Sequence, residues 1–396
     1  MKNRKTKISK VLSLAAISTV LAFDAHAVDV EIGDTTLSVS GFIDLDVNFT
    51  RTSDGELAGN STGRNFFIAQ SVPVVADDSD VESGVDTDFT ASTTRLKVST
   101  ETPTKIGLVK THIETDFAVS DFGNEAVSNS FQLRLRRAFV DFKGWRIGQE
   151  WSTFQPLHAL PETATFLVAS ESVIFQRTPQ IRYTTGPWQF SIENPNTLIG
   201  GGLVDGGLAN DSIIPEVVVR RNFITDRSNV SFSVIGRQLA FEDSDLDVDS
   251  SAFGIGASLA AKIKVGDNGD DVRFAVTGGQ GVGRYVGLAF APGAYVDSDG
   301  TLAAVPTIGG NIAYRKVFGK SSLSVGVSAI EVDNDRDWVG VTDQTNKASR
   351  SGHMSLTHRL LPNLTVAGEL LYGQLEQEGG DRGDIRRVTM SVRKSF

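Results

Sequence analysis

The stretch FQLRLRRAFVDF, residues 131–142, decides the fold of this chain. Within it, Leu133 and Leu135 alternate with Arg134 and Arg136. This period of two predicts a β-strand with one apolar face and one face that carries a row of guanidinium groups. Such a strand fits a soluble sheet whose polar face meets water. It also fits a transmembrane barrel whose apolar face meets lipid and whose arginines face a water-filled lumen.

The residues that follow this strand predict how the lumen is narrowed. The alternation changes phase near Arg136 and Arg137, which indicates a β-bulge. A second strand is expected over 145–151 and a third over 180–184, the latter carrying Arg182. The intervening segment from Ser152 to Arg177 has no clean alternation. We expect this segment to fold inward and constrict the pore.

The first 27 residues have the pattern of a cleaved secretory signal. A basic head is followed by a mostly apolar run, Val11 to Phe23, and then by Ala25-His26-Ala27, a suitable cleavage site. Removing five basic residues and one acid leaves 33 basic and 47 acidic residues, a net charge of −14. This balance argues against nucleic-acid binding. The chain has no cysteine, so no disulfide stabilises the exported domain, which we expect to be a single barrel over 28–396.

The rest of the chain repeats the two-faced pattern. From Leu37 to Phe49 apolar residues alternate with polar ones, interrupted by Phe42 on the polar face. Short turns alternate with long, acidic, glycine-rich loops, as in outer-membrane barrels. The acids between 77 and 88 match no EF-hand spacing, so a solvated loop is favoured over a calcium site. We expect sixteen strands, at 37–49, 94–101, 106–119, 131–142, 145–151, 180–184, 188–193, 216–223, 230–241, 253–263, 272–277, 308–317, 323–332, 350–358, 364–374 and 385–396.

The chain contains the motifs Gly148-Gln149-Glu150-Trp151-Ser152-Thr153-Phe154, Leu160-Pro161-Glu162-Thr163, Arg177-Thr178-Pro179-Gln180-Ile181-Arg182-Tyr183, Glu193-Asn194-Pro195 and, near its start, Gly41-Phe42-Ile43-Asp44-Leu45-Asp46. With these motifs it resembles the DcaP-like trimeric outer-membrane porin family. The resemblance implies a sixteen-stranded, trimeric porin that passes small anionic solutes such as dicarboxylates. Some members carry a coiled-coil extension between signal and barrel, whereas here about ten residues precede the first strand, so trimerisation is expected to depend on the barrel wall.

Rings of basic residues favour anions in a pore, and the planar guanidinium pairs well with carboxylates. The alternative for each arginine is a structural ion pair with a lumen acid such as Glu114, Asp116, Asp141 or Glu150. The acidic outer loops oppose anion entry, but salt screens that repulsion within about 8–10 Å. The expected pore-lining set is Arg134, Arg136 and Arg182, with Arg95 and Lys110 nearby, faced by Glu162 and Glu171 of the inward segment.

Two other classes of protein remain as alternatives. A barrel enzyme of the phospholipase or protease type is disfavoured because neither a Gly-x-Ser-x-Gly nor a His-Glu-x-x-His motif is present. A soluble exported β-sandwich leaves the terminal Phe396 without a role. In an outer-membrane barrel of a Gram-negative cell, a final strand ending in Phe396 resembles the signal read by the barrel-assembly machinery. We therefore expect no cofactor and no bound metal, and as partners the lipid bilayer, lipopolysaccharide, small anions and two further copies of the chain.

Overall fold

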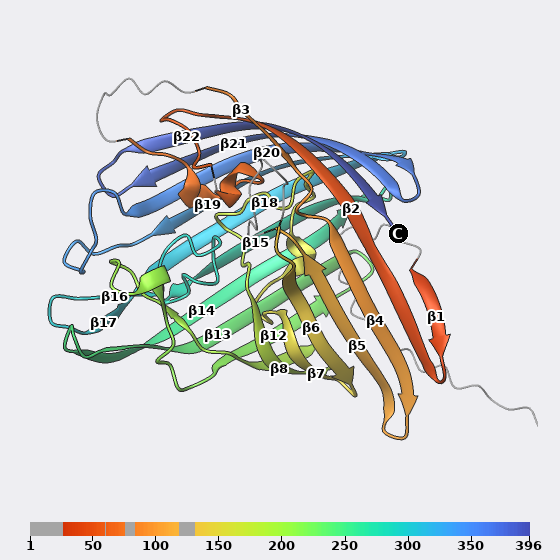
Figure 1. Cartoon of the computed structure of the whole chain (residues 1–396), viewed down its shortest axis with the longest axis horizontal. Coiled ribbons are helices and arrows are strands. Elements are labelled where there is room, and N and C mark those ends of the chain that lie inside the picture. Colours follow the sequence, from red (N-terminus) through yellow and green to blue (C-terminus); the bar gives the residue numbers. More distant parts are fainter. Residues whose placement is uncertain (1–26, 60, 76–83, 119–130) are drawn as a thin grey trace, which may run out of the picture.

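The computed structural model describes residues 27–59, 61–75, 84–118 and 131–396. Eighteen strands of this part of the chain form one antiparallel sheet. β3 and β4 pair with successive parts of the same edge of β2, and β1 pairs with the first residues of β2 alone. The wall therefore has sixteen strand positions. Pairing of β2 with β22 closes it into a barrel (Figure 1).

The sixteen expected strands are all present, and several are longer than expected. Between the expected strands 230–241 and 253–263, residues 242–243 and 248–252 continue the two strands. The carboxylate of Asp243 closes the tight turn at 244–247 by accepting from the backbone NH groups of Asp245 and Leu246. The sheet comprises β1 Val28–Ile32, β2 Thr35–Thr52, β3 Asp86–Thr90, β4 Arg95–Thr104, β5 Gly107–Asp116, β6 Arg134–Phe142, β7 Trp145–Trp151, β8 Arg177–Thr185, β9 Trp188–Glu193, β12 Glu216–Ile224, β13 Ser228–Asp243, β14 Val248–Val265, β15 Asp270–Gln280, β18 Pro306–Phe318, β19 Ser321–Val332, β20 Asn346–Leu361, β21 Leu364–Gln377 and β22 Arg382–Ser395.

The alternation of apolar and polar residues along the strands determines which face of the wall points outward and which faces the water-filled lumen. On β2, Ile43 and Leu45 are exposed on the outside, whereas Asp44 and Asp46 are fully buried on the inside. On β22, Val388 and Met390 point outward and Arg387 and Thr389 inward. Apolar groups outside and polar groups inside are the arrangement of a barrel in lipid. No helix among the described residues is long and apolar enough to cross a membrane.

The two ends of the barrel differ. Connections of two to four residues join the strands at the end that holds the C-terminus, whereas the other end carries the long connections and the small β16–β17 hairpin (Figure 1). By analogy with barrels of this kind, the short-turn end faces the periplasm. The remaining short elements lie in connections: η1 Thr62–Arg64, η2 Ala69–Ser71, η3 Leu157–Ala159, β10 Thr197–Leu198, η4 Asp205–Gly207, β11 Leu208–Ala209, β16 Ala294–Val296 and β17 Leu302–Ala304.

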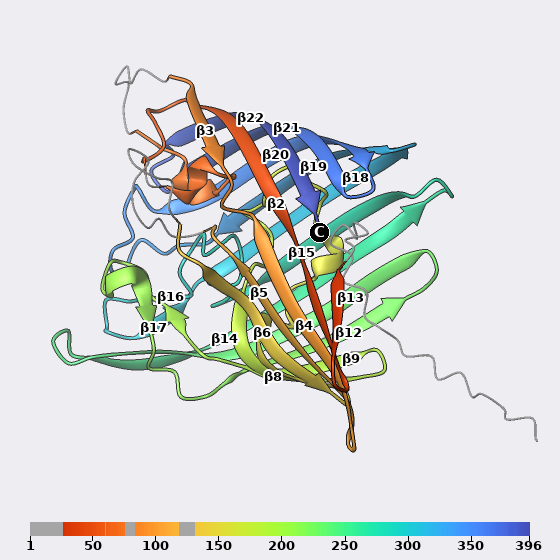
Figure 2. The same cartoon turned by 45° about the vertical axis from the view of Figure 1, so that its right-hand side comes forward.

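The N-terminal strand extends the wall beyond its periplasmic rim. β22 ends where Phe396 exchanges backbone hydrogen bonds with Gly41, and β1 then occupies the same edge of β2, with Val28 opposite Val39. Figure 2 shows β1 and the β4–β5 hairpin projecting at this end. The signal expected at 1–27 lies outside the described residues, apart from Ala27. The ten or so residues before the first expected strand therefore form a hairpin with it.

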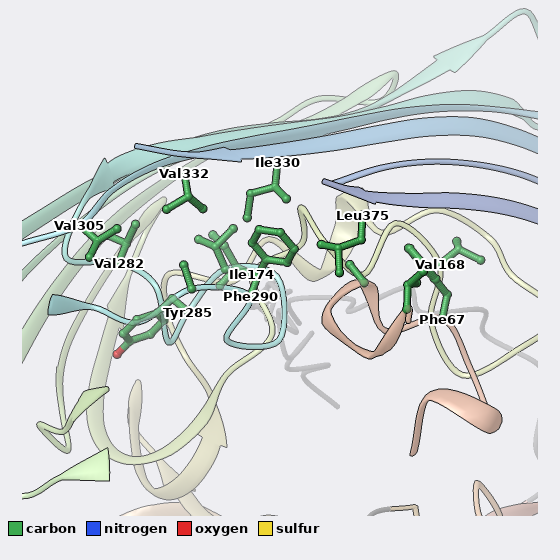
Figure 3. Close-up of a cluster of buried hydrophobic side chains, with 14 of the residues drawn as sticks. Phe67, Val168, Ile174, Val282, Tyr285, Phe290, Val305, Ile330, Val332 and Leu375 are labelled. Atoms are coloured by element: carbon green, nitrogen blue, oxygen red, sulfur yellow. The ribbon is translucent and has the colours of Figure 1, made fainter. Parts of the chain in front are cut away.

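Three long connections fold back into the lumen and form an apolar core there (Figure 3). They are residues 53–75, 152–176 and 281–305. Phe67 of the first, Val168 of the second and Tyr285 of the third are each about 1% exposed or less. The second and third are also joined through their backbones, since the NH of Phe175 donates to the carbonyl of Tyr285 over 2.9 Å. The expected inward fold of the segment after Trp151 is thus present, supported by two further connections.

Candidate functional site

The inward segment, residues 152–176, is held against one side of the barrel. Near its start, Ala159 packs against Ala260 and Ala275 of β14 and β15. Farther on, the carboxylate of Glu162 accepts from Arg315 of β18 over 3.0 Å and from the Ser322 hydroxyl of β19. The segment therefore follows the wall rather than crossing the lumen freely.

The tip of the inward segment is fixed by one buried carboxylate of β21. Glu369 accepts hydrogen bonds from the hydroxyls of Thr163 (2.8 Å) and Thr165 (3.1 Å) and from the backbone NH of Ala164 (2.9 Å). A fourth hydrogen bond, from Ser355 of β20 (2.6 Å), orients the carboxylate. Hydrogen bonds to a buried charged acceptor are among the stronger ones, so this contact should set the position of the tip.

The opposite wall faces the inward segment across a cavity of about 280 Å³. Its lining comes from β2, β4, β5, β6 and β22, with Trp151 of β7, and from the inward segment together with Arg273 of β15, which binds that segment. Six of the lining side chains are basic and two are acidic. These residues are Arg95, Lys97, Arg136, Arg137, Arg273 and Arg393, with Glu114 and Glu162.

A β-bulge places adjacent arginines in this wall. In the pairing of β5 with β6, Glu114 lies opposite Arg137 and Thr115 opposite Leu135, so Arg136 is the extra residue. Because of it, Arg136 and Arg137 both line the cavity although they are adjacent in sequence. The side-chain amide of Gln149 donates to the carbonyls of Leu135 (3.1 Å) and Arg136 (3.2 Å), which satisfies backbone groups at the irregularity. The expected phase change near Arg136 is therefore confirmed.

Most of the arginines in this wall are paired with acids. Arg136 is 2% exposed and bonds Glu114 over 2.7 Å as well as pairing with Asp116. Arg134 bonds Asp116 over 2.8 Å. The ion-pair alternative therefore describes these two arginines, because their carboxylate partners occupy the donors that a solute would need.

Other cations of the wall are also paired with acids but keep part of the side chain exposed to the lumen. Arg137 bonds Glu150 over 2.6 Å, Arg393 bonds Asp44 over 2.6 Å, and Arg95 lies 3.5 Å from Glu114. Arg95, Arg137 and Arg393 have side chains that are 16, 21 and 20% exposed. Lys97 is half-buried and lies opposite Glu114 in the register of β4 and β5. These four side chains are the cations of this wall that a solute in the cavity can reach, and their acidic partners weaken the field they produce.

The structure separates the expected pore residues into several environments. Arg95, Arg136 and Glu162 line the cavity together, whereas Arg134 belongs to the ion pairs behind it. Arg182 is nearly buried on β8, where it donates to Gln180 over 3.0 Å and to the carbonyl of Trp151.

The two other expected residues lie away from the cavity. Lys110 is half-exposed near the periplasmic tip of β5 and pairs with Glu101 of β4. Glu171 is fully buried and accepts from Ser328 of β19, so it holds the inward segment rather than facing the solute. Alternation predicts that the side chain of Lys110 points inward but gives no measure of its height in the pore.

Sequence reasoning did not select four of the cavity cations as pore residues: Lys97, Arg137, Arg273 and Arg393. Lys97 and Arg393 lie on the polar faces of expected strands, so alternation placed them inside without showing that they meet the inward segment. Arg137 could be placed only by locating the bulge exactly. Arg273 donates to the carbonyl of Leu160 over 2.8 Å, a contact that depends on the path of the inward segment.

Aromatic rings occur on both sides of the cavity. Phe42, the residue that interrupts the polar face of β2, lies between the guanidinium groups of Arg95 and Arg393, at 5.1 and 4.6 Å. Trp151 is nearly buried in the lumen under Arg177, with the guanidinium carbon 4.7 Å from the ring centroid. Trp188, in contrast, is exposed on the outside.

Two titratable groups of the inward segment, which lies outside the spanning strands, have shifted pKa values. Burial, reinforced by the nearby Arg220 guanidinium, lowers the pKa of His158 to about 3. His158 is therefore neutral at physiological pH, and its Nδ1 lies 3.2 Å from a guanidinium nitrogen of Arg220. Burial raises the pKa of Glu171, although hydrogen bonds from Ser328 and Ser351 oppose this effect.

The described residues contain no group of three or more His, Asp or Glu side chains arranged to hold a metal ion. Of the acids considered for calcium, Asp86 and Asp88 pair with Arg64. Asp77, Asp78, Asp80 and Glu82 lie outside the described residues.

Comparison with known proteins shows which family has this architecture. The sequence model of a protein family described as a porin subfamily matches residues 33–394. The outer membrane channel DcaP of Acinetobacter baumannii is similar, with 18% identity over 92% of this chain and 99% of that one and a TM-score of 0.72. OmpT of Vibrio cholerae has 9% identity over 93 and 100% of the two chains and a TM-score of 0.54.

An anion-selective porin from Comamonas acidovorans has 12% identity over 91 and 100% of the chains and a TM-score of 0.53. No curated protein matches significantly. The resemblance to DcaP-like porins inferred from the central motifs is confirmed. The chain belongs to the porin subfamily and is an outer-membrane porin of sixteen strands.

Proposed function

We propose that this porin is a trimeric diffusion channel that favours small anions, dicarboxylates among them. The observation that carries the proposal is the excess of six basic over two acidic side chains around the cavity between wall and inward segment. A low-dielectric wall strengthens the field of such charges relative to bulk water. A carboxylate passing through would exchange part of its hydration for contacts with Arg95, Lys97, Arg137 and Arg393.

The electric field across the cavity is weaker than the field that a row of basic residues facing a row of acidic residues would produce. Glu162 is the acid of the inward segment that lines the cavity, and Arg315 and Ser322 already bind it. The basic wall is therefore not matched by an equal acidic one. This asymmetry favours selection by sign of charge over orientation of dipolar solutes.

Uptake by liposomes tests the solute preference. Succinate should enter proteoliposomes faster than an uncharged solute of similar size, and faster than a diamine of similar length. In a variant carrying Arg95→Gln, Lys97→Gln and Arg393→Gln, the advantage of succinate should disappear while the uncharged solute enters as before. Lys110→Gln is the matched control, since it removes a cation outside the cavity. Equal rates for succinate and the diamine in the unaltered protein would contradict the proposal.

Trimer formation is supported by the trimer form recorded for OmpT of Vibrio cholerae and by the extension at the periplasmic rim. Val28, Val30 and Ile32 of β1 are 61, 45 and 60% exposed. They lie beyond the last residue of β22, where lipid tails would not cover them. A further copy of the chain would cover this apolar face, so trimerisation would use β1 in addition to the barrel wall.

Export through a cleaved signal at 1–27 and insertion through the barrel-assembly machinery complete the proposal. β22 ends at Ser395, and the next residue, Phe396, is 39% exposed and has its backbone paired with that of Gly41 of β2. Deleting Phe396 should lower the yield of inserted protein in cells but leave the conductance of the molecules that do insert unchanged. An equal yield would remove the proposed role of the terminal residue.

A further inference from the structure

Phe42 interrupts the polar inner face of β2, and the function proposed above gives it no role. The inward residues before and after it, Ser40 and Asp44, are polar, whereas the ring of Phe42 is half-buried and lines the cavity. A half-buried ring removes less apolar surface from water than a core residue does, so packing alone does not account for it. The two arginines beside the ring supply another explanation.

Strand pairing places a guanidinium group on each side of this ring. On one edge of β2, Arg95 of β4 is directly opposite Phe42. On the other edge, Arg393 of β22 is opposite Asp44, the next inward residue. The two guanidinium carbons lie 5.1 and 4.6 Å from the ring centroid. Because the face of an aromatic ring attracts a cation within about 6 Å, Phe42 attracts both arginines.

The acids near these two arginines leave most of their N–H donors unused. Arg95 lies 3.5 Å from Glu114 and 3.9 Å from Asp116, which are distances of loose ion pairs rather than of good hydrogen bonds. Arg393 donates to Asp44 over 2.6 Å. The Nε of each arginine is buried and has no hydrogen-bond partner among the described residues. A buried charged donor without an acceptor is costly, so the ring and a bound anion are the groups that would compensate it.

A second ring of the inner wall provides a contrast. Phe139 of β6 lies 5.3 Å from the guanidinium carbon of Arg137 and 4.0 Å from that of Arg146. Both arginines also pair with Glu150, which accepts from two nitrogens of Arg137 over 2.6 Å each. Around Phe139 the acid therefore fixes the guanidinium groups. Around Phe42 the contacts with acids are fewer or longer, so the ring has more influence on where the guanidinium groups lie.

We propose that Phe42 is a positioning residue that holds Arg95 and Arg393 on either side of its ring, so that a dicarboxylate in the cavity can bind both. This inference rests on the anion preference proposed above and names the residue that organises it. A ring face attracts a guanidinium without occupying its N–H donors, which stay available for the paired hydrogen bonds that a carboxylate accepts. Without the ring, both side chains should turn toward their acids and the site should lose its geometry.

Block of the chloride current by succinate, recorded from single channels in planar bilayers, tests the role of the ring. In Phe42→Leu, which keeps an apolar side chain, the half-blocking concentration of succinate should rise about 5- to 30-fold. This range is the loss of one or two cation–π contacts, about 1–2 kcal/mol at about 1.4 kcal/mol per factor of ten. Phe42→Tyr keeps the ring face and should change the concentration less than about twofold. Phe139→Leu is the matched control, since it removes a ring that also contacts two arginines, and its effect should be equally small.

A folded Phe42→Leu channel that succinate blocks as in the unaltered protein would overturn the inference. So would an equal loss of block in Phe139→Leu, because any ring of the wall would then have the same effect. Faster passage of uncharged solutes through Phe42→Leu with unchanged block would show a steric role only and would also overturn it. Phe42→Met, which likewise lacks a ring, serves if the Leu variant fails to fold.

Reversal potentials under a salt gradient separate this inference from the proposed function. If the unaltered porin prefers anions and loss of the ring leaves the block by succinate unchanged, the proposed function stands and the role of Phe42 fails. A preference for cations in the unaltered porin would contradict the proposed function, and the inference would fail with it.

Discussion

Replacing Glu369 by alanine should release the tip of the inward segment. Glu369 is 3% exposed and accepts three hydrogen bonds from residues 163–165. Hydrogen bonds to a charged group contribute about 1.5–3 kcal/mol each, which gives an upper limit of about 5–9 kcal/mol. Water entering from the lumen would satisfy part of these donors, so we expect a cost of about 2–4 kcal/mol.

A cost of this size changes the balance between the held and released tip by about 30- to 700-fold. Single-channel recording should therefore detect a higher open-channel noise and a larger mean conductance in Glu369→Ala. Glu369→Gln keeps one acceptor oxygen and should give an intermediate effect. Glu376→Ala, on the same strand but paired with Arg382 at the outer rim, should behave like the unaltered protein.

The reasoning would be refuted if Glu369→Ala folded normally and conducted with unchanged amplitude and noise. In that case the packing of Ala159 and the Glu162–Arg315 pair would suffice to hold the segment. A variant that fails to fold is distinguished by its migration on an unheated gel. Glu369→Gln then provides the measurement.

Three further results are expected. The pKa of His158 in the folded protein is depressed to about 3, below its value in the unfolded chain. The stability that depends on a neutral His158 is therefore fully present above about pH 6.5. It is lost progressively as the pH falls toward 3, at up to about 1.4 kcal/mol per pH unit. Urea unfolding at pH 7 and pH 5 should thus be less pH-dependent in His158→Gln, and an equal dependence would contradict this. Val30→Asp should shift trimers toward monomers in light scattering, whereas an unchanged mass would show that β1 lies outside the contact. Gly148→Ala should reduce the folded yield sharply, because its φ is +135° and a Cβ would lie 2.2 Å from the carbonyl oxygen of Ala138; a normal yield would refute this.

The barrel could be predicted from the sequence because its signal is local. Ile43 and Asp44, or Leu135 and Arg136, are adjacent, so alternation assigns each to lipid or lumen without knowledge of the rest of the chain. The bulge also left a local mark, the change of phase after Arg136. Loops were less predictable, because acidic residues such as Asp243 occur both in long connections and in tight turns.

The pore site could be predicted only in part, because it depends on height and on distant contacts. Alternation places Arg95 and Lys110 on the inner face alike, yet Arg95 meets the inward segment and Lys110 lies near the periplasmic tip. Glu162 and Glu171 are nine residues apart in the same segment, but only Glu162 lines the cavity. The position of each glutamate depends on a partner more than 150 residues away in sequence: Arg315 for Glu162 and Ser328 for Glu171.

The sign of the reversal potential in a planar bilayer under a salt gradient tests most directly whether the basic wall selects anions. With potassium chloride more concentrated on one side, the reversal potential of the unaltered porin should have the sign expected when chloride is the more permeant ion. In the triple variant Arg95→Gln, Lys97→Gln and Arg393→Gln, the reversal potential should move toward zero or change sign. A potential set by potassium in the unaltered protein, or one that the triple variant leaves unchanged, would contradict the account.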